Sequence, residues 1–524
     1  MAADAVALSV FNSLLASIAE EMGATLIRSS MSPNIRERHD LSCAVFDAAG
    51  NLVAQAAHIP VHLGAMPASV AAVQALAPFA PGDIVILNDP YLGGSHLPDV
   101  TMVSPVFGEA RPRRLIGYVA SRAHQSDIGG MAPGSMPLAS ELIQEGLIIP
   151  PVRLYSRGRL NEDILALILR NVRTPVERMG DFEAQVSAQK TGERRLMELA
   201  SRYGTRLLRR RMAEVQDYAE RLTRARLHRI PEGRYTFRDQ LDGDGRTNEP
   251  VVVNVAITVK GGELEADFDG TAAERAGSIN AVPAVARSAV YYAVFCLIGD
   301  EAPINAGGFR PITVKLPEGS ILSPQNFRAV SAGNVETSQR IVDTVFGALS
   351  QAMPELIPAA SNGSMNNVLI GGFDRVKGRP FTYYETLGGG AGGGPERPGL
   401  SAVHTHMTNT LNTPIEAIEA TYPFRIVGYS IRGGTGGDGQ HRGGDGLRRI
   451  YEFLEPAEVT LMTERRKHAP WGLAGGSPGE TGKNVLLRRN GERVELPAKA
   501  TFAVEAGDSV VVDTPGGGGW GRSR

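Results

Sequence analysis

The chain is poor in the features that mark secreted, membrane and nucleic-acid-binding proteins. Only two cysteines occur among its 524 residues, Cys43 and Cys296, and they lie far apart in apolar stretches. A disulfide framework is therefore excluded, and we expect both thiols to be buried in a protein of the reducing cytoplasm. The formal net charge is only −2, so the overall charge predicts neither nucleic-acid binding nor attachment to a membrane surface.

Long apolar segments are also missing. No run of about 18 apolar residues occurs, so we expect no membrane-spanning helix. The N-terminal stretch, residues 1–23, lacks a basic start, and Glu20 and Glu21 interrupt its apolar residues. It therefore predicts an amphipathic helix from about Asp4 to Ile27 rather than a signal peptide.

A P-loop for nucleotide phosphates is missing as well. The stretch "SPGETGKN", residues 477–484, lacks the first glycine of that motif and the Ser or Thr that should follow Lys483. Two glycine-rich stretches, 388–393 and 433–439, match G-x-G-x-x-G, but neither lies between a strand and a helix. We therefore expect ATP to bind elsewhere than at these segments. Residues 385–394 read as a flexible glycine loop, and such loops are expected to line a substrate channel or a subunit contact.

The hydrophobic periodicity predicts an α+β fold, a multi-layer mixed α/β arrangement with antiparallel sheets, long central helices and a β-rich C-terminal part. Helices are expected at 161–172, 175–228 with a break near Gly204, 283–298 and 335–352. Strands are expected at 41–57, 82–90, 100–107 and 114–122, in alternating segments from 234, and in short segments after 424. The predicted parts are an N-terminal metal-binding domain with long helices (1–230), an α/β middle domain (231–423) and a β-rich C-terminal region (424–524).

Two predicted hairpins bring potential metal ligands together at their open ends. If Phe107 pairs with Arg114, Asp99 lies opposite Arg122. The open end of this hairpin then gathers His96, Asp99 and His124. A pairing of Asp47 with Leu52 in the preceding hairpin gathers His39, Asp40, His58 and His62. Five of the ten histidines thus fall within residues 39–124.

Imidazole and carboxylate groups in such a cluster favour Zn²⁺, Mn²⁺ or Fe²⁺ over Mg²⁺ and Ca²⁺, which prefer shells of oxygen alone. An ion with an open coordination position lowers the pKa of water toward neutrality. A single His-x-x-Asp also fits a turn hydrogen bond or a helix cap. His58 and His62 fit packing or support of the ligands.

Several motifs, in order along nearly the whole chain, resemble the B-type subunits of the hydantoinase/oxoprolinase family. They include "RERHDLSCAVFDAAGNLVAQAAHIPVHLGAMP", "GDIVILNDPYLGGSHLPDVTMVSPVF", "RAHQSDIGGMAPGSMP", "EGLIIPPVRL", "DFDGTA", "GSINAVPAV", "GNVETSQRIVD" and "VHTHMTNTLNTPIE". The resemblance implies metal ligands at Asp40, His96, Asp99 and His124, of which spacing alone supports Asp40 least.

The resemblance also implies a division of labour in an ATP-dependent cyclic amidase. An A-type partner binds ATP and phosphorylates the amide oxygen of a hydantoin, lactam or oxoproline, and the B-type subunit hydrolyses that intermediate. A dimer of A–B heterodimers is the assembly that the resemblance suggests. His124 and Asp127 are the candidate catalytic residues, with Asp127 as a general base or as a group that orients a ligand. A turn or helix cap is the competing interpretation of Asp127.

Two other functions stay open at this point. The family includes subunits of acetone and acetophenone carboxylases, so a ketone carboxylase subunit is the first alternative, although 524 residues is short for those chains. A scaffold that only stabilises an A-type subunit is the second. The sequence leaves open the roles of His39, His58, His62, His404 and His406. Glu336 is expected to belong to the polar residues that start a helix.

Overall fold

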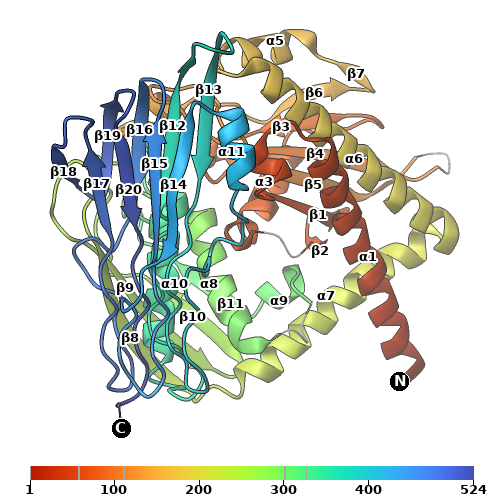
Figure 1. Ribbon diagram of the computed structural model, residues 1–524. Coiled ribbons are helices and arrows are strands. Elements are labelled where there is room, and N and C mark those ends of the chain that lie inside the picture. The colour runs from red at the N-terminus through yellow and green to blue at the C-terminus, as the bar shows by residue number, and fades with distance from the viewer. Residues whose placement is uncertain (1, 57–58, 110–112, 300–302, 326, 524) are drawn as a thin grey trace.

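The computed structural model describes residues 2–56, 59–109, 113–299, 303–325 and 327–523. It has the predicted α+β architecture, with helices and several antiparallel sheets (Figure 1). The helices are α1 (Ala2–Ser29), α2 (Pro33–Arg36), α3 (Ala65–Gln74), α4 (Leu142–Glu145), α5 (Glu162–Arg170), α6 (Pro175–Tyr203), α7 (Thr205–Leu227), α8 (Pro283–Ile298), α9 (Ala306–Phe309), α10 (Ser338–Leu349) and α11 (Ile415–Thr421). Three shorter helical turns are η1 (Pro60–His62), η2 (Pro90–Leu92) and η3 (Gly333–Thr337).

The N-terminal part is a seven-stranded antiparallel sheet in the order β2-β1-β5-β4-β3-β6-β7. Its strands are β1 (Leu41–Asp47), β2 (Leu52–Gln55), β3 (Ile84–Leu87), β4 (Asp99–Phe107), β5 (Leu115–His124), β6 (Val152–Ser156) and β7 (Arg159–Leu160). Successive side chains of β1 enter two different cores: Cys43 and Val45 pack under α1 and α6, whereas Ala44 and Phe46 face the main core. Because both faces are covered, the ends of these strands can hold buried polar groups.

The register of the β4–β5 hairpin differs from the prediction by two residues. One residue of this difference arises because Phe107 pairs with Leu115 and not with Arg114, and the bulge between Val106 and Phe107 adds the second. The predicted pairing would have left Asp99 and His124 diagonal to each other. The observed register makes them direct partners.

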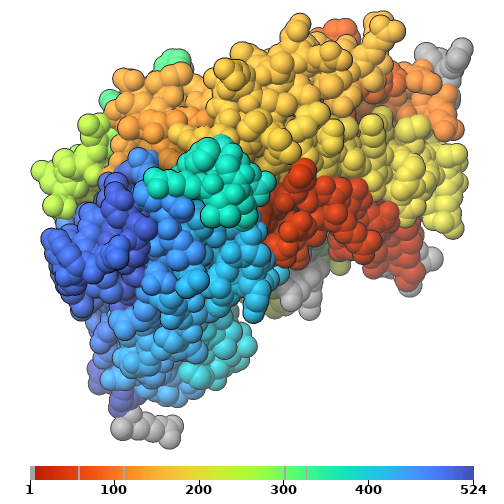
Figure 2. Space-filling view, turned by 45° about the horizontal axis from the view of Figure 1, so that its top comes forward, coloured from red at the N-terminus to blue at the C-terminus, as the bar shows by residue number. Residues whose placement is uncertain are grey.

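The long helices follow the predicted pattern. Gly204 separates α6 from α7, and Pro175 is the first residue of α6. Thr174 occupies the predicted cap position, but its side chain makes no capping hydrogen bond. Helices α1 and α6 lie along each other on the N-terminal sheet, and Figure 2 shows α1 (red) at the surface between the yellow helical region and the blue C-terminal part.

Three further sheets form the rest of the molecule. Their strand orders are β11-β10-β9-β8, β13-β12-β16-β19 and β14-β15-β20-β17-β18. The strands are β8 (Gly233–Leu241), β9 (Val251–Lys260), β10 (Glu263–Asp267), β11 (Ile312–Lys315), β12 (Asn367–Asp374), β13 (Arg379–Glu385), β14 (Phe424–Ile431), β15 (Leu447–Phe453), β16 (Ala457–Met462), β17 (Lys483–Leu487), β18 (Arg493–Leu496), β19 (Lys499–Val504) and β20 (Ser509–Asp513). Helices α8 and α10 lie toward the middle of the molecule (Figure 1). The domain boundaries expected near 230 and 423 fall between elements and stay predictions.

Residues 385–390 are buried and the rest of the stretch 385–394 is packed against other segments, which corrects the expectation of a flexible loop there. The backbone amide of Gly390 donates to the carbonyl of Pro515, and that of Gly517 donates to the carbonyl of Gly444. A Cβ atom added at Gly517 would overlap the carbonyl oxygen of Ala391. Glycine is needed here because several extended segments pack backbone against backbone.

One of the two expectations for the cysteines is wrong. Cys43 is buried on β1, whereas Cys296 is exposed near the end of α8. Among the described residues, no helix combines the length and the hydrophobicity that crossing a bilayer requires.

Candidate metal centre

Three potential metal ligands, His96, Asp99 and His124, meet at the end of the β4–β5 hairpin. One ligand atom from each lies within 4.8 Å of the others, and all three residues are buried. Oδ1 of Asp99 lies 3.2 Å from Nε2 of His96 and 3.3 Å from Nδ1 of His124. The structure thus assembles three of the four predicted ligands.

The chain positions these side chains through strand pairing and a tight turn. Asp99 is the first residue of β4 and His124 is the last residue of β5, and the two are direct partners across the sheet. His96 lies in the turn before β4, where its carbonyl accepts a hydrogen bond of 3.1 Å from the amide of Asp99. Gly93, at a φ of +96°, closes the preceding turn in a conformation that suits glycine. Asn88 holds the same turn by donating to the carbonyl of Leu97.

Three ring nitrogens of His96 and His124 lack hydrogen-bond partners among the described residues, as expected for atoms that coordinate a cation. Both ring nitrogens of His96 and Nε2 of His124 are buried and have no hydrogen-bond partner among the described residues. Buried polar atoms without partners are unfavourable, and metal coordination would satisfy them. The three side chains therefore fit a divalent transition metal with nitrogen and oxygen ligands.

The electrostatics favour the protonation states that a metal needs. Burial alone would raise the pKa of Asp99, but nearby His96 and His62 outweigh it and hold that pKa well below its usual value. Burial lowers the pKa of His124, opposed in part by Asp99 and Asp40. At neutral pH the centre therefore offers a carboxylate and a neutral imidazole, which are the ligating forms.

His62 contributes to the centre without belonging to the three-residue cluster. Its Nε2 lies 3.3 Å from Oδ2 of Asp99, and its Nδ1 shares a hydrogen bond of 2.7 Å with the hydroxyl of Ser42. The hydroxyl of Ser95 donates to the same Oδ2 at 2.6 Å. Asp99 is therefore held from two sides, and His62 has the supporting position that the sequence left as one of its two readings.

Asp40 lies beside the cluster but outside it. Its side chain lines the same cavity as His62, Asp99 and His124. Its Oδ2 lies 3.9 Å from Nη2 of Arg38, and its backbone carbonyl accepts a hydrogen bond from the amide of His124. A role of Asp40 as a fourth ligand stays a prediction.

Asp127 points into a different environment from the one predicted for a catalytic base. Its Oδ1 pairs with Nη1 of Arg173 at 2.8 Å, and its Oδ2 accepts hydrogen bonds from the amides of Gly129 and Arg173. Asp127 is not among the residues that line the cavity. The structure thus shows the turn-stabilising interaction that was its competing interpretation.

The cavity next to the cluster has a void of about 20 Å³, which is room for about one water molecule. Its walls mix the ligands with apolar and hydroxyl-bearing side chains. The lining residues outside the two hairpin ends and residues 59–62 are Asn334, Val335, Met365, Tyr384, Thr386, Met407, Thr408 and Thr410. Sequence reasoning assigned none of these residues to the site. Asn334 and Val335 lie in the quoted motif "GNVETSQRIVD", and Met407, Thr408 and Thr410 lie in "VHTHMTNTLNTPIE", but neither motif indicates that its residues pack against the N-terminal hairpins.

The other histidines that the sequence left open lie around this cavity or away from it. His39 is half-buried, in a left-handed conformation with φ of +57°. His404 has a pKa lowered by burial to about 4, and Nε2 of His406 lies 3.5 Å from Oδ1 of Asp343. None of the three lines the cavity. His58 lies outside the described residues.

Glu336, which the sequence read as helix-start chemistry, lies in the π-helical turn η3 before α10 and caps no helix. Its Oε1 accepts hydrogen bonds from the side chain of Asn367 and from the amide of Met365. Asn367 in turn accepts a hydrogen bond from the hydroxyl of Tyr384. Glu336 is thereby connected to the wall of the cavity.

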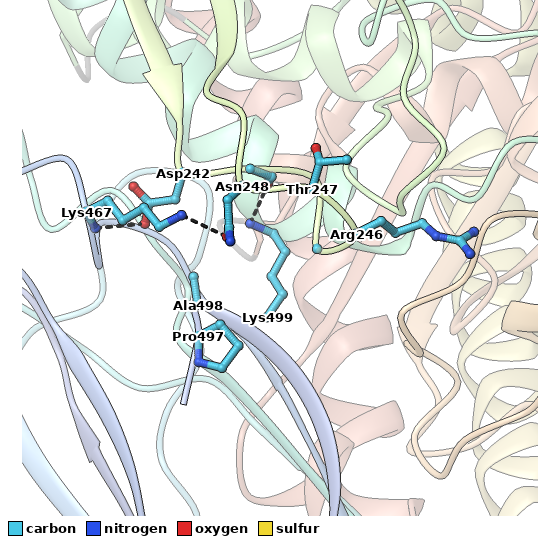
Figure 3. Close-up of a pocket in the computed structure, with 10 residues that line it drawn as sticks. Asp242, Arg246, Thr247, Asn248, Lys467, Pro497, Ala498 and Lys499 are labelled. Carbon is cyan, nitrogen blue, oxygen red and sulfur yellow. Dashed lines mark hydrogen bonds between the residues drawn. The ribbon is translucent and has the colours of Figure 1, made fainter. Parts of the chain in front are cut away.

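A larger cavity of about 200 Å³ lies between the loop 243–248 and the segments around Lys467 and Lys499 (Figure 3). Its charged groups are largely satisfied internally. Lys499 donates to the carbonyl of Gly243 and pairs with Glu464, and Lys467 donates to Asn248. The side chain of Arg246 points away from the others (Figure 3). With no cluster of open ligand atoms, this cavity is the weaker candidate for a reactive site.

Comparison with known proteins identifies the family of this chain. The family model described as Hydantoinase B/oxoprolinase matches residues 4–523. An uncharacterized protein of Methanocaldococcus jannaschii is 40% identical over 99% of this chain and 91% of its own length. The 5-oxoprolinase 1 of Arabidopsis thaliana is 38% identical over 99% of this chain, which spans only 42% of that protein. The B-type subunit of a putative D-/L-hydantoinase from a Pseudomonas species is 31% identical over 99% of this chain and 90% of its own length.

Two solved structures have the same fold. An ATP-dependent caprolactamase from Pseudomonas jessenii superposes with a TM-score of 0.91 at 29% identity, over 99% of this chain and 91% of that one. A nucleotide-free acetone carboxylase gives a TM-score of 0.91 at 19% identity, over 98% of this chain and 75% of that one. The match over nearly every residue shows that this chain belongs to the hydantoinase B/oxoprolinase family.

Proposed function

We propose that this chain is the hydrolytic subunit of an ATP-dependent cyclic amidase, and that it acts on a phosphorylated hydantoin, lactam or oxoproline made by an ATP-binding A-type partner. The family membership and the likeness to an ATP-dependent caprolactamase support the reaction class. The observation that carries the proposal is the buried cluster of His96, Asp99 and His124 at the edge of a small cavity.

In this proposal the three clustered residues hold one Zn²⁺, Mn²⁺ or Fe²⁺ ion, with Asp40 as the fourth ligand. Such an ion, when bound, supplies Lewis-acid chemistry that lowers the pKa of water and so provides a nucleophile at neutral pH. The donor set supports a transition metal over Mg²⁺ because two of the donors are imidazoles.

The chain's own residues hold the ligands in place. His62 and Ser95 fix both the position and the charge of Asp99 through contacts of 3.3 Å and 2.6 Å. Tyr384 lies flat against the ring of His124, with 4.4 Å between ring centroids. Apolar side chains of Ile59, Val61, Val335, Met365 and Met407 line the same cavity. They keep bulk water from the reacting carbon and lower the local polarity.

A partner subunit follows from the need for a phosphorylated substrate. An unactivated amide is a poor electrophile, and phosphorylation of its oxygen makes the carbon open to attack by water. The sequence around Lys483 lacks the P-loop residues that would bind ATP. The hydantoinase relative is itself named as one subunit of an enzyme, which supports an assembly with an A-type partner, such as a dimer of A–B heterodimers.

The test is to purify the chain with its A-type partner, measure its metal content, and supply ATP with a panel of cyclic amides. We expect close to one equivalent of a transition metal and ring opening that depends on ATP. Turnover only with a ketone and bicarbonate would instead show a carboxylase subunit. A metal-free chain whose complex opens rings at full rate would mean that this subunit is a scaffold.

A further inference from the structure

One unpartnered polar side chain faces the candidate metal centre from the second half of the chain. Asn334 lines the cavity together with Asp99 and His124. Only 4% of Asn334 is exposed, and its side-chain oxygen has no hydrogen-bond partner among the described residues. A buried carboxamide oxygen without a partner is unfavourable for folding, which points to a partner that arrives from outside the chain.

The backbone around Asn334 is held firmly. Asn334 lies in the π-helical turn η3, a kind of turn that occurs often at functional sites. The amide of the preceding Gly333 donates to the carbonyl of Ser278 at 3.0 Å, and a Cβ at Gly333 would overlap the carbonyl of Asn280. On the other side, the hydroxyl of Ser338 donates to the carbonyl of Asn334 at 2.6 Å. The turn therefore fixes the carboxamide at the cavity wall.

We propose that Asn334 binds the ring nitrogen of the cyclic amide and so positions the reacting carbon beside the metal ligands. The inference rests on the function proposed above. A ring nitrogen that carries hydrogen can donate to Oδ1, and a nitrogen without hydrogen can accept from Nδ2, so a carboxamide suits both states. The ring nitrogen gives up its hydrogen when phosphorylation of the amide oxygen makes a C=N bond, and it takes up protons again when the C–N bond breaks and an amine is released.

The rest of the cavity suits the ring itself. Val335, Met365 and Met407 provide apolar surface for methylene groups, and Thr408 and Thr410 add hydroxyls. All of these residues follow Asn334 in the sequence. A small ring can thus be held by its nitrogen at one point and by apolar contact elsewhere.

Binding of a ring requires one wall of this cavity to move, because the present void of about 20 Å³ holds only about one water. Met407, Thr408 and Thr410 belong to a stretch without helix or strand that precedes α11. This stretch is the wall that a substrate displaces, since Asn334 and the ligands are fixed by the turn η3 and by strand ends.

The test compares Asn334→Leu and Asn334→Asp with wild type, each purified with the A-type partner. Pyrrolidin-2-one, 5-oxoproline and hydantoin serve as probes, and the best substrate of the wild type is used for the series. We expect Asn334→Leu to lower kcat/KM by about 10- to 100-fold, and Asn334→Asp, which keeps an acceptor of the same shape, to lose less. The metal content of both variants should stay at the wild-type level. The ratio of ADP formed to rings opened should rise, because fewer molecules of the phosphorylated cyclic amide are hydrolysed to the open product.

The exposed Asn490, in the turn between β17 and β18, lines neither cavity and provides the matched control, and Asn490→Leu should leave kcat/KM and the ratio of ADP formed to rings opened unchanged. If Asn334→Leu keeps the wild-type kcat/KM and the wild-type ratio of ADP formed to rings opened, the inference is overturned and the proposed function stays intact. Loss of metal from Asn334→Leu would also overturn it, because the residue would then support the ligands. If the wild-type complex opens none of the rings, the proposed function fails and the role of Asn334 falls with it.

Discussion

The ring of Tyr384 lies against the imidazole of His124, with 4.4 Å between the ring centroids and 17° between their planes. Tyr384 belongs to β13 and His124 to β5, so the stack joins two sheets. The hydroxyl of Tyr384 donates to Asn367 at 2.9 Å, which fixes the rotation of the phenol ring. The orientation of a candidate metal ligand is thus set from a distant part of the chain.

Replacing Tyr384 separates stacking from hydrogen bonding. Tyr384→Phe keeps the ring on His124 and is expected to change metal affinity less than about 3-fold. Tyr384→Leu removes the flat surface and should lower metal affinity about 10-fold, as for other groups that orient a ligand. Competition with a chromogenic chelator measures both values. Equal affinities in Tyr384→Leu and wild type would show that the stack does not hold His124.

Removing a clustered ligand should abolish metal binding without unfolding the protein. Asp99→Ala and His124→Ala are each expected to lower bound metal and turnover by more than about 100-fold. The circular dichroism spectrum should match that of the wild type. Elemental analysis of the purified complex is the measurement, and Asp269→Asn, at an exposed position, is the control. Full turnover of metal-free Asp99→Ala would refute the ligand assignment.

Replacing Asp127 distinguishes a catalytic role of this residue from a role in stabilising the turn. Its carboxylate pairs with Arg173 and accepts two backbone amides. We therefore expect Asp127→Asn to lower the free energy of unfolding by about 1–3 kcal/mol and to leave kcat nearly unchanged in the folded enzyme. Urea unfolding and initial rates check the two parts. A fall in kcat of about 100-fold with unchanged stability would restore the predicted catalytic role.

Glu336 should make stability depend on pH. Burial, together with the nearby Glu464, raises its pKa from 4.5 to about 8. The folded state therefore favours the protonated form, so this contribution is full below pH 4.5 and is lost as the pH rises toward 8. Glu336→Gln imitates the protonated form, and its stability relative to wild type should grow over that interval by a few kcal/mol. Urea unfolding at several pH values measures this, and a constant difference would contradict it.

Glycines whose backbone packs directly against another backbone segment, such as Gly517, should not tolerate even one methyl group. Gly517→Ala would place a Cβ against the carbonyl of Ala391, and backbone cannot give way as a side chain does. We expect a loss of several kcal/mol or failure to fold. Gly433→Ala is the control, because nothing lies within 4 Å of a Cβ there. Thermal melting compares the two, and similar melting temperatures would show that the segments can separate.

The sequence revealed the part of the site that follows from local patterns. Alternating residues and turn signals located both hairpins, and the position of Asp99 and His124 at strand ends brought them together. The register was predicted two residues away, because Phe107 pairs with Leu115 and not with Arg114, and because the bulge at Val106 and Phe107, which has no sequence signal, adds a second residue. The cluster survived that error because both side chains stay at the same end of the hairpin.

The other half of the site could not be read from local patterns. Asn334 in η3, Tyr384 on β13 and Thr408 in a segment without helix or strand reach the cavity only through tertiary packing, and no periodicity records such contacts. Asp127 shows the opposite problem: its position three residues after His124 suggested chemistry, its contacts stabilise a turn, and its catalytic role stays a prediction. The packed glycine segments match neither the period of a helix nor that of a strand, and this is why their pattern resembles that of a flexible loop.

The stack of Tyr384 on His124 has a consequence for how the centre matures. The N-terminal hairpins carry all the predicted donors, yet the wall that closes around them comes from residues 334 to 410. During synthesis the metal-ligating side chains of the hairpins would emerge from the ribosome before residues 334–410. An ion bound at that stage would be exposed to solvent. Once residues 334–410 pack against the hairpins, the same side chains line a buried cavity with a void of about 20 Å³, so we expect the completed chain to exchange such an ion more slowly than the hairpins alone.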